Sequence, residues 1–360
     1  MIKTGYIVGP RSDAVWFVAL PFAALLIGLA CQQWLSAVAV TSVALLITGP
    51  HHFVTLFRTF GLSEDRHRFA DRLIVGLIVI TAIIAAGTLY APLTLVLLTV
   101  MWNQQHSMMQ IHGFSRIYDF KAGSGYERTG RWDFWLNLVL YANLFITVPP
   151  LVNFWVRELH RFGIPISSAG VQVVHQVSWT ITIAACVVYL GHHWWLARRG
   201  YGVNPMKLLF LACSYGVLYV AGFHAASVLV FAITAQIIHG VQYIVIVYYF
   251  VRRKTTGEKP GLLSFAVRPG NAVVFVSFLI AYAVAIQMIG GRSFDELTFG
   301  LVTSMTNQYP AVSSIGVGAF TTGAGDATVG TIIVSIPGLL HLYYDSFIWK
   351  VREKKIHGGL

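Results

Sequence analysis

Long runs of apolar residues recur through the whole sequence and restrict it to one kind of fold. A helix that crosses a lipid bilayer needs about 20 mostly apolar residues. Stretches of this kind can be read at roughly 14–34, 36–58, 72–90, 92–117, 132–156, 175–197, 206–223, 225–250, 271–290 and 330–350. Because a backbone in lipid must satisfy its own hydrogen bonds, these stretches predict an all-α, polytopic transmembrane helical bundle of about ten spans.

Charged residues are too scarce for a water-soluble fold. They make up 11% of the 360 residues, whereas an ordinary soluble domain has about 25%. The composition therefore excludes a soluble globular protein, a disordered chain and a nucleic-acid-binding module. The three cysteines, Cys31, Cys186 and Cys213, lie in apolar runs without a CxxC pair, so no disulfide framework or zinc ribbon is predicted.

The basic residues predict how the chain is oriented in the membrane. With ten spans, 22 of the 25 Lys and Arg residues fall on the side that holds both termini, and only Arg157, Arg161 and Arg292 fall on the other. Cytoplasmic loops carry an excess of Lys and Arg, so both termini are predicted to be cytoplasmic. The net charge of +11 then reflects topology and attraction to anionic lipid headgroups. We expect a multi-pass protein of the bacterial inner membrane.

The sequence shows no sign of a separate soluble domain. Residues 1–360 are predicted to form a single integral membrane domain. Its longest connection, 291–329, is rich in Gly, Ser and Thr and is predicted to be non-cytoplasmic. This connection is apolar enough to re-enter the membrane, although a flexible outer loop fits its composition equally well.

The positions of the histidines are the main functional signal. Ionisable residues inside spans are costly and mark candidate functional sites. Eight of the 13 histidines lie in the cytoplasmic halves of even-numbered predicted spans: His51, His52, His106, His112, His192, His193, His239 and His341. Side chains on facing helices build the ligand sites of helical bundles, so these residues are predicted to form one metal site under the inner surface.

Neighbouring residues refine this prediction. Asp345 follows His341 by four residues, so it shares a helix face with the ring and either binds the same metal or orients the imidazole. Tyr243 and Tyr344 are candidates to supply a proton or a hydrogen bond. Adjacent helical residues point about 100° apart, so only one of the pair at 51 and 52 is expected to bind.

Anchoring at the membrane interface is an equally good reading of His192 and His193. These two residues directly precede the sequence WWLARR. Trp residues gather at the membrane–water boundary, and a histidine pair beside them fits that position as well as it fits a metal site.

The types of ligand atom narrow the choice of metal ion. Imidazole with a carboxylate suits Fe, Zn, Cu or Mn, and no HExxH motif of zinc hydrolases is present. We therefore predict a non-haem site with one or two iron ions. The enzyme would be an oxygenase or desaturase-like oxidoreductase that acts on a lipophilic substrate from the bilayer, with or without a separate electron donor.

Two other functions use the same histidines. Pairs of them could be axial ligands of a haem in an electron-transfer protein. They could also form the relay of a metal or proton transporter. The transporter is disfavoured because the ionisable residues do not continue through the outer half of the spans, and because no inverted repeat is visible.

Three short windows resemble a known enzyme family. They are GPHHF at 49–53, QQHSMMQIHG at 104–113 and IPGLLHLYYD at 336–345. They are similar to dispersed versions of the motifs PHG-x-x-D and PH-x-x-x-x-D of Brp/Blh-type membrane β-carotene dioxygenases. The first window has Thr55 and Leu56 in the neighbourhood where that family has Asp. The resemblance implies a polytopic membrane oxygenase with histidine-bound non-haem iron.

Overall fold

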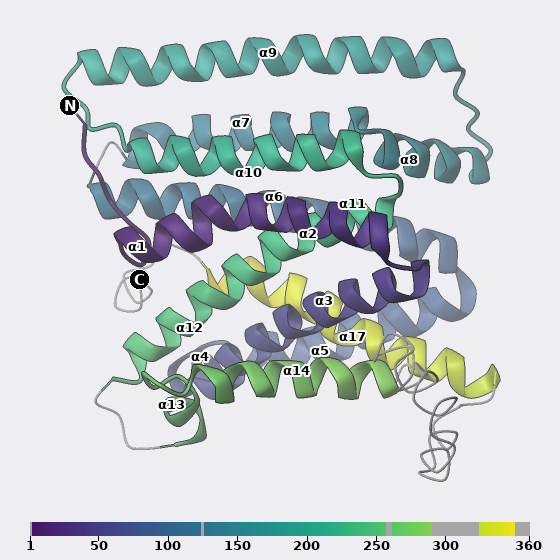
Figure 1. Cartoon of the computed structure of the whole chain (residues 1–360). Helices are drawn as coiled ribbons and strands as arrows, with labels where there is room; N and C mark the ends of the chain where they lie inside the picture. Colours follow the sequence, from purple (N-terminus) through teal and green to yellow (C-terminus); the bar gives the residue numbers. More distant parts are fainter. Residues whose placement is uncertain (1, 124–125, 257–260, 290–323, 350–360) are drawn as a thin grey trace. The chain divides into compact units, whose positions relative to one another are not determined.

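The computed structural model describes residues 2–123, 126–256, 261–289 and 324–349, and this part of the chain is helical without a β-strand (Figure 1). The elements in chain order are α1 (Pro10–Asp13), the π-helix η1 (Ala14–Ala19), α2 (Leu20–Trp34), α3 (Ala37–Gly61), α4 (Ser63–Arg68), α5 (Ala70–Tyr90), α6 (Pro92–Ala122), α7 (Tyr126–Thr147), α8 (Pro149–Arg161), α9 (Ser168–Arg198), α10 (Pro205–His224), α11 (Val228–Gln236), the π-helix η2 (Ile237–Val241), α12 (Gln242–Lys254), α13 (Leu262–Ala266), α14 (Ala272–Ile289) and α17 (Ala324–Ile348). The prediction of an all-α fold is confirmed.

Several of these helices could cross a membrane. Six are long and apolar enough: Pro10–Trp34, Ala70–Tyr90, Ser168–Arg198, Pro205–His224, Val228–Lys254 and Ala272–Ile289. The pair α7 and α8 makes a seventh if it counts as one span. Each predicted stretch is helical over its described residues, except that 132–156 is broken at Val148. The count of ten spans and the cytoplasmic termini remain predictions. The predicted loop at 291–329 lies mostly outside the described residues.

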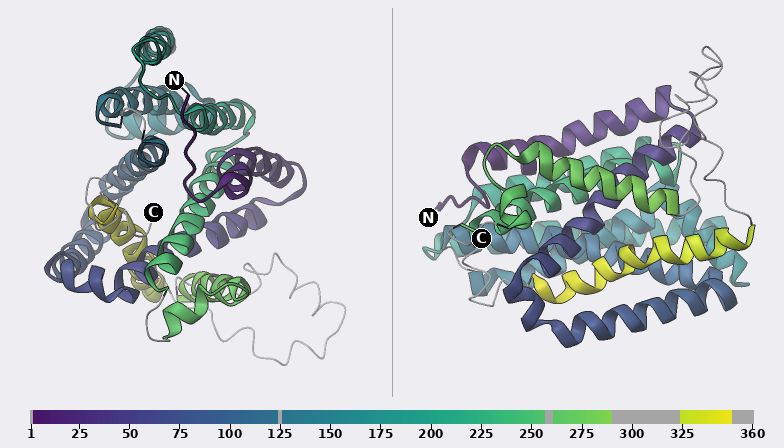
Figure 2. Two further views of the ribbon diagram at one scale, coloured as in Figure 1. Left: turned by 90° about the vertical axis from the view of Figure 1, so that its left-hand side faces the viewer. Right: turned by 90° about the horizontal axis from the view of Figure 1, so that it is seen from below.

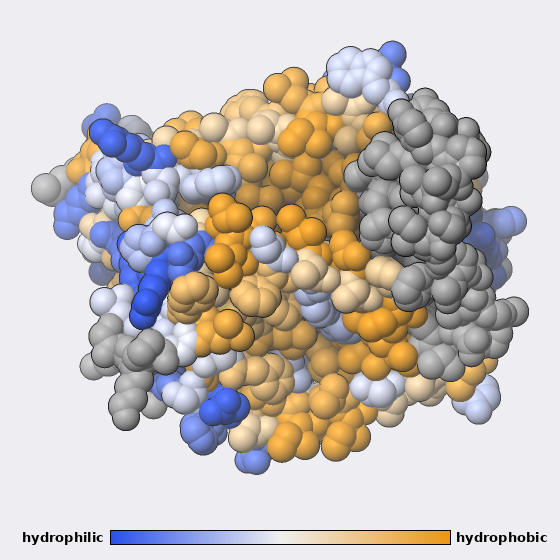
Figure 3. All heavy atoms as spheres, turned by 60° about the horizontal axis from the view of Figure 1, so that its bottom comes forward, coloured by the Kyte–Doolittle hydropathy of each residue, from blue (hydrophilic) through white to orange (hydrophobic). Residues whose placement is uncertain are grey.

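The outward faces of the candidate spans are apolar. Val187 of α9 and Val273 of α14 are 65% and 76% exposed, and Ile78 of α5 is 63% exposed. Figure 3 shows one face of the molecule, on which apolar side chains cover a broad area and hydrophilic side chains gather at its edge. Large exposed apolar patches mark interaction or membrane surfaces, so these faces are suited to contact with lipid.

The chain forms two compact units, and it passes between them within helices. Unit 1 consists of Met1–Gln33 and Asn103–Gln242, and unit 2 consists of Trp34–Trp102 and Tyr243–Leu360. The three boundaries fall at the end of α2, inside α6 and near the start of α12. The single integral membrane domain predicted for 1–360 remains a prediction.

Unit 1 is built on α7, which packs against α9 and α10 (Figure 1). Phe17 of η1 lies at the centre of an aromatic core: its ring is 5.3 Å from Phe114 and 6.2 Å from Phe210, with edge-to-face geometry. Aromatic pairs in this arrangement add stability beyond their buried area. This core fixes the part of α6 that carries the unit 1 histidines.

Unit 2 is built on α3 and α17. Helix α3 packs against α14 and α17, and α17 packs against α5 (Figure 2). A Cβ atom on Gly49 would lie 2.7 Å from Cβ of Ala283, so α3 and α14 approach closely because both residues are small. Pro50 and Pro337 lie inside α3 and α17, one residue and four residues before the histidines of those helices.

The stretch predicted as one span at 132–156 is instead a bent helix pair. Helices α7 and α8 meet at an angle of 75°. Val148, between them, is extended with φ −74° and ψ 125°, because the residue before a proline avoids the helical region. Pro149 and Pro150 then occupy the first turn of α8, where proline is tolerated.

Candidate metal centre

Unit 2 brings three of the predicted histidines together. His51 and His52 lie on α3, and His341 lies on α17. The ring centroid of His341 is 4.1 Å from that of His51 and 5.4 Å from that of His52. His51 and His341 are 2% and 1% exposed. Two buried imidazoles in direct contact form a histidine group that could hold a metal ion.

A threonine orients the His341 ring. Thr55 Oγ1 lies 2.6 Å from His341 Nδ1 and donates to Asp345 Oδ1 at 3.1 Å. Because the hydroxyl has a single proton, this arrangement makes it accept from Nδ1–H of His341. Nε2 then carries the lone pair of the ring. Metal-binding histidines usually donate their other N–H to such a partner.

Asp345 therefore acts mainly through Thr55. Its Oδ2 atom lies 3.7 Å from His341 Nδ1, which is beyond a normal hydrogen bond. Of the two predicted roles for Asp345, orientation of the ring fits this geometry better than ligation. Thr55 itself was not identified from the sequence, although its position one turn after His51 places it on the same helix face.

Tyr243 completes this polar group in unit 2. Its hydroxyl donates to Asp345 Oδ1 at 2.6 Å and accepts from Trp349 Nε1 at 3.1 Å. Its ring lies edge-on to His51, with centroids 4.7 Å apart. Tyr243 is 2% exposed. The Tyr243 hydroxyl thus holds a proton one hydrogen bond away from the Asp345 carboxylate.

A buried arginine fixes the tryptophan that contacts Tyr243. The Arg58 guanidinium lies 3.8 Å from the Trp349 ring and 4.2 Å from the Phe250 ring. It also donates to the Ile348 carbonyl at 2.9 Å and pairs with Asp65 at 3.3 Å. Such cation–π contacts are strongest where water is excluded, and Arg58 is 1% exposed.

Tyr344, the other predicted catalytic tyrosine, has a different role. Its hydroxyl donates to the Leu73 carbonyl at 3.0 Å, so it ties α17 to α5. Its ring is part of an apolar cluster that contains Leu73, Ile80 and Phe347. Tyr243, and not Tyr344, is the tyrosine whose hydroxyl reaches Asp345.

Unit 1 holds a second pair of predicted ligands. The rings of His106 on α6 and His239 on η2 are 5.0 Å apart, edge to face, and both residues are 8% exposed. His239 lies in the middle of a π-helical turn, and its carbonyl accepts from Gln110 Nε2 at 2.8 Å. Single π-turns in α-helices are often found at functional sites.

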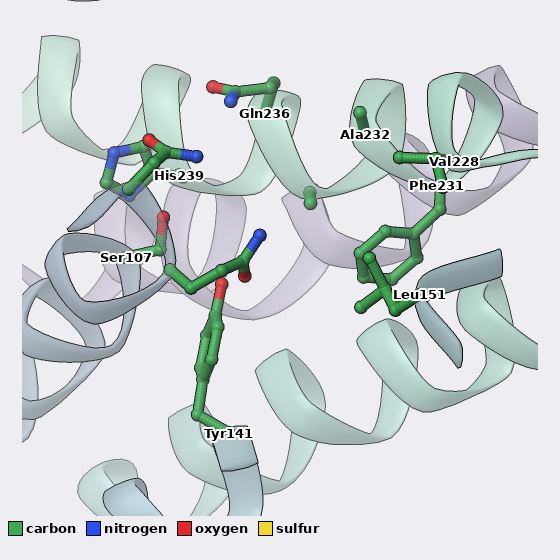
Figure 4. Close-up of a pocket in the computed structure, with 11 residues that line it drawn as sticks. Ser107, Tyr141, Leu151, Val228, Phe231, Ala232, Gln236 and His239 are labelled. Atoms are coloured by element: carbon green, nitrogen blue, oxygen red, sulfur yellow. The ribbon is translucent and has the colours of Figure 1, made fainter. Parts of the chain in front are cut away.

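A pocket lies beside His239. It has a volume of about 60 Å³. Figure 4 shows His239, Ser107 and Gln236 at one end and Phe231, Leu151 and Val228 at the other. All of its lining residues belong to unit 1.

The other three predicted ligands lie in different surroundings. The His112 ring packs edge-on against Phe134. His192 stacks between Trp132 and Trp195, with ring centroids 4.6 and 5.9 Å away. That arrangement matches the alternative reading of His192 as an interface anchor.

His193 has both ring nitrogens engaged in unit 1. Nδ1 lies 3.1 Å from the Tyr189 carbonyl, and Nε2 lies 3.0 Å from Lys207 Nζ. Nε2 therefore accepts from the ammonium while Nδ1–H donates to the carbonyl. A ring with both nitrogens occupied has no lone pair for a metal in this arrangement.

Sequence reasoning also missed a buried charge network in unit 1. Lys207 donates to Asp119 at 2.9 Å and to Asp133 at 3.1 Å, and Arg116 pairs with both carboxylates. Tyr189 donates to Asp133 at 2.8 Å. The two acidic and two basic groups balance. The sequence did contain a sign of this network. Asp133 lies inside a predicted span, where an ionisable residue needs a partner.

Comparison with the models of known protein families, with curated proteins and with solved structures finds no match to this chain.

Proposed function

We propose that this protein is a membrane-embedded metalloprotein, and that it is a non-haem iron oxidoreductase that acts on a lipophilic substrate. The observation that carries the proposal is the contact of His51 with His341, whose Nδ1 is held by Thr55. Buried imidazoles with their second nitrogen engaged by a polar partner are typical of metal ligands. The apolar outer faces of the helices support a substrate that arrives from the bilayer.

His106 and His239 are the proposed additional ligands, and their rings lie 5.0 Å apart in unit 1. Both residues are buried, and imidazole donors suit iron, zinc or copper.

The residues of unit 2 have distinct proposed roles. A bound iron ion would supply the redox chemistry and the binding of O₂. His51 and His341 would bind it, while Thr55 and Asp345 keep the His341 ring in one tautomer and orientation. The Tyr243 hydroxyl would hold a proton for transfer, with Asp345 as its acceptor. The three histidine windows that resemble Brp/Blh-type dioxygenases also favour iron.

A haem protein fits this geometry less well. Axial histidines bind the iron from opposite faces of the porphyrin, which separates their rings. Centroid distances of 4.1 Å for His51 and His341 and 5.0 Å for His106 and His239 are those of rings in direct contact. Neither pair leaves room for a macrocycle between its rings.

Elemental analysis of the detergent-purified chain tests the proposal. After growth in iron-supplemented medium, we expect iron to co-purify with the wild type and to be lost from His51→Ala and His341→Ala. His160→Ala is the matched control, because this histidine is exposed on α8, and its iron content should equal that of the wild type.

An absorption spectrum of the same preparation separates the alternatives. A strong Soret band would replace the proposal with the haem protein. Absence of any bound transition metal from the wild type, or retention of full metal content in both unit 2 variants, would overturn the metal site itself. Size-exclusion profiles show that each variant is folded before its metal is counted.

A further inference from the structure

The pocket beside His239 has a lining that defines a ligand class. Its polar lining residues are Asn103, Gln104, Ser107, Tyr141, Gln236 and His239. Its other lining residues are Leu151, Val228, Phe231, Ala232 and Ala235. No Asp, Glu, Lys or Arg is among them. The pocket therefore combines many hydrogen-bonding groups with a lack of formal charge.

This lining matches a neutral polar group. A carboxamide both donates and accepts, and a hydroxyl does the same. Asn103, Gln104 and Gln236 supply three carboxamides, and Ser107 and Tyr141 supply two hydroxyls. A charged head would lose its hydration in this pocket without a counter-ion, which is costly. A ketone, quinone or alcohol oxygen meets both donors and acceptors there.

The two ends of the pocket differ in character. His239, Ser107 and Gln236 lie at one end, and Phe231, Leu151 and Val228 lie at the other (Figure 4). Val228 is 37% exposed, whereas Phe231 and Leu151 are buried. The apolar end thus leads to the surface of unit 1 at the start of α11, whereas His239 and Ser107 at the polar end are buried.

The size of the pocket limits what enters it. A water molecule needs roughly 10–15 Å³ of such space, so about 60 Å³ accommodates a polar head and its first carbons. A longer apolar tail would have to continue past Val228. A pure hydrocarbon would form no hydrogen bond with the carboxamides and hydroxyls of this lining.

We infer that this pocket binds the neutral, oxygen-bearing end of a lipophilic molecule, a ketone, quinone or alcohol, with its polar atom directed toward His239. The inference names the substrate class for the proposed oxidoreductase and rests on that function for its chemistry. The binding step itself needs only the pocket. A hydrocarbon without oxygen, such as β-carotene, is not the ligand that this lining selects.

Thermal unfolding of the full chain in detergent tests this with four probes of equal chain length: decan-2-one, decan-1-ol, decanoate and decane. Ligands that bind only the folded state raise the unfolding temperature. We expect the ketone and the alcohol to raise it, and decanoate and decane to leave it unchanged. Gln236→Leu and Tyr141→Phe each remove one hydrogen-bonding group, so ketone affinity should fall about threefold to tenfold.

Gln105→Leu is the matched control, because Gln105 is an exposed carboxamide on α6 that does not line the pocket. Its ketone affinity should equal that of the wild type. Equal binding of decane and decan-2-one, tightest binding of decanoate, or unchanged ketone affinity in Gln236→Leu would overturn the inference. Iron is counted in every sample: ketone binding without iron would defeat the proposed function alone, whereas iron without ketone binding would defeat the pocket alone.

Discussion

The two units bury polar side chains in contrasting ways. In unit 1, Lys207 and Arg116 neutralise Asp119 and Asp133, and the nitrogens of His193 are both occupied. In unit 2, imidazoles contact each other, and the one carboxylate of the group accepts from Tyr243 and Thr55. A network that satisfies its own charges holds helices together. A group of imidazoles beside one carboxylate could instead hold a cation.

Breaking the charge network of unit 1 should have the largest effect on stability. Lys207→Met leaves two buried carboxylates with Arg116 alone, and removal of one partner from a buried ion pair costs about 3–5 kcal/mol. Thermal unfolding in detergent measures this loss. Lys254→Met is the control, because Lys254 pairs with the exposed Glu64 and surface pairs contribute about 0–1 kcal/mol. Equal destabilisation by the two variants would show that the charge network of unit 1 does not hold its helices together more strongly than a surface ion pair does.

Removal of the metal should destabilise the protein through unit 2. A ligand present at about 100 times its Kd stabilises the folded state by roughly 2.7 kcal/mol. A chelator should therefore lower the unfolding temperature of the wild type and leave His341→Ala unchanged. Chelator-induced unfolding of His341→Ala to the same degree would show that the bound metal lies elsewhere.

Loss of the threonine that orients His341 should weaken metal binding without abolishing it. Thr55→Val keeps the volume and removes the contact to Nδ1 of His341. Changes to such supporting residues typically cost 10–100-fold in metal affinity, which competition with a chelator measures. Thr59→Val is a close control, since its buried hydroxyl one turn later has no hydrogen-bond partner among the described residues. Similar metal affinities for the two variants would show that Thr55 does not support metal binding.

The smallest effect is expected for the tyrosine hydroxyls. Tyr344→Phe loses one buried hydrogen bond, which is worth roughly 0.5–1.5 kcal/mol. Tyr243→Phe loses the bonds to Asp345 and Trp349, so it should be the less stable of the two. Only Tyr243→Phe should change the turnover of a ketone or alcohol substrate, because only that hydroxyl contacts Asp345. A matching loss of turnover in Tyr344→Phe would assign both residues a purely structural role.

Much of the fold and part of the site follow from local sequence patterns. Apolar runs predicted each major helix, and the four-residue spacing of His341 and Asp345 placed them on one face. The bend at Val148 was missed because the apolar run continues across Pro149 and Pro150. The change to a π-turn at His239 has no compositional marker of its own, so the sequence could not reveal it.

The partners of buried groups were harder to predict than their positions. Thr55 contacts a residue 286 positions away in the chain, and Asp119 contacts a lysine 88 positions away. Periodicity assigns a residue to a helix face, but it does not say which helix that face meets. This is why the sequence predicted the histidines and not the threonine, and why it grouped His193 with residues whose surroundings differ.

The π-turn at Ile237–Val241 has a consequence for how this helix tolerates change. A π-turn accommodates one more residue than an α-turn, so the extra residue is absorbed within the turn. Deleting a single residue there would restore a regular α-helix with little rotation of the residues that follow, whereas a deletion from an α-helical segment rotates them by about 100°. The direction of the Tyr243 side chain should therefore survive the loss of one residue from Ile237–Val241 better than a loss from α12.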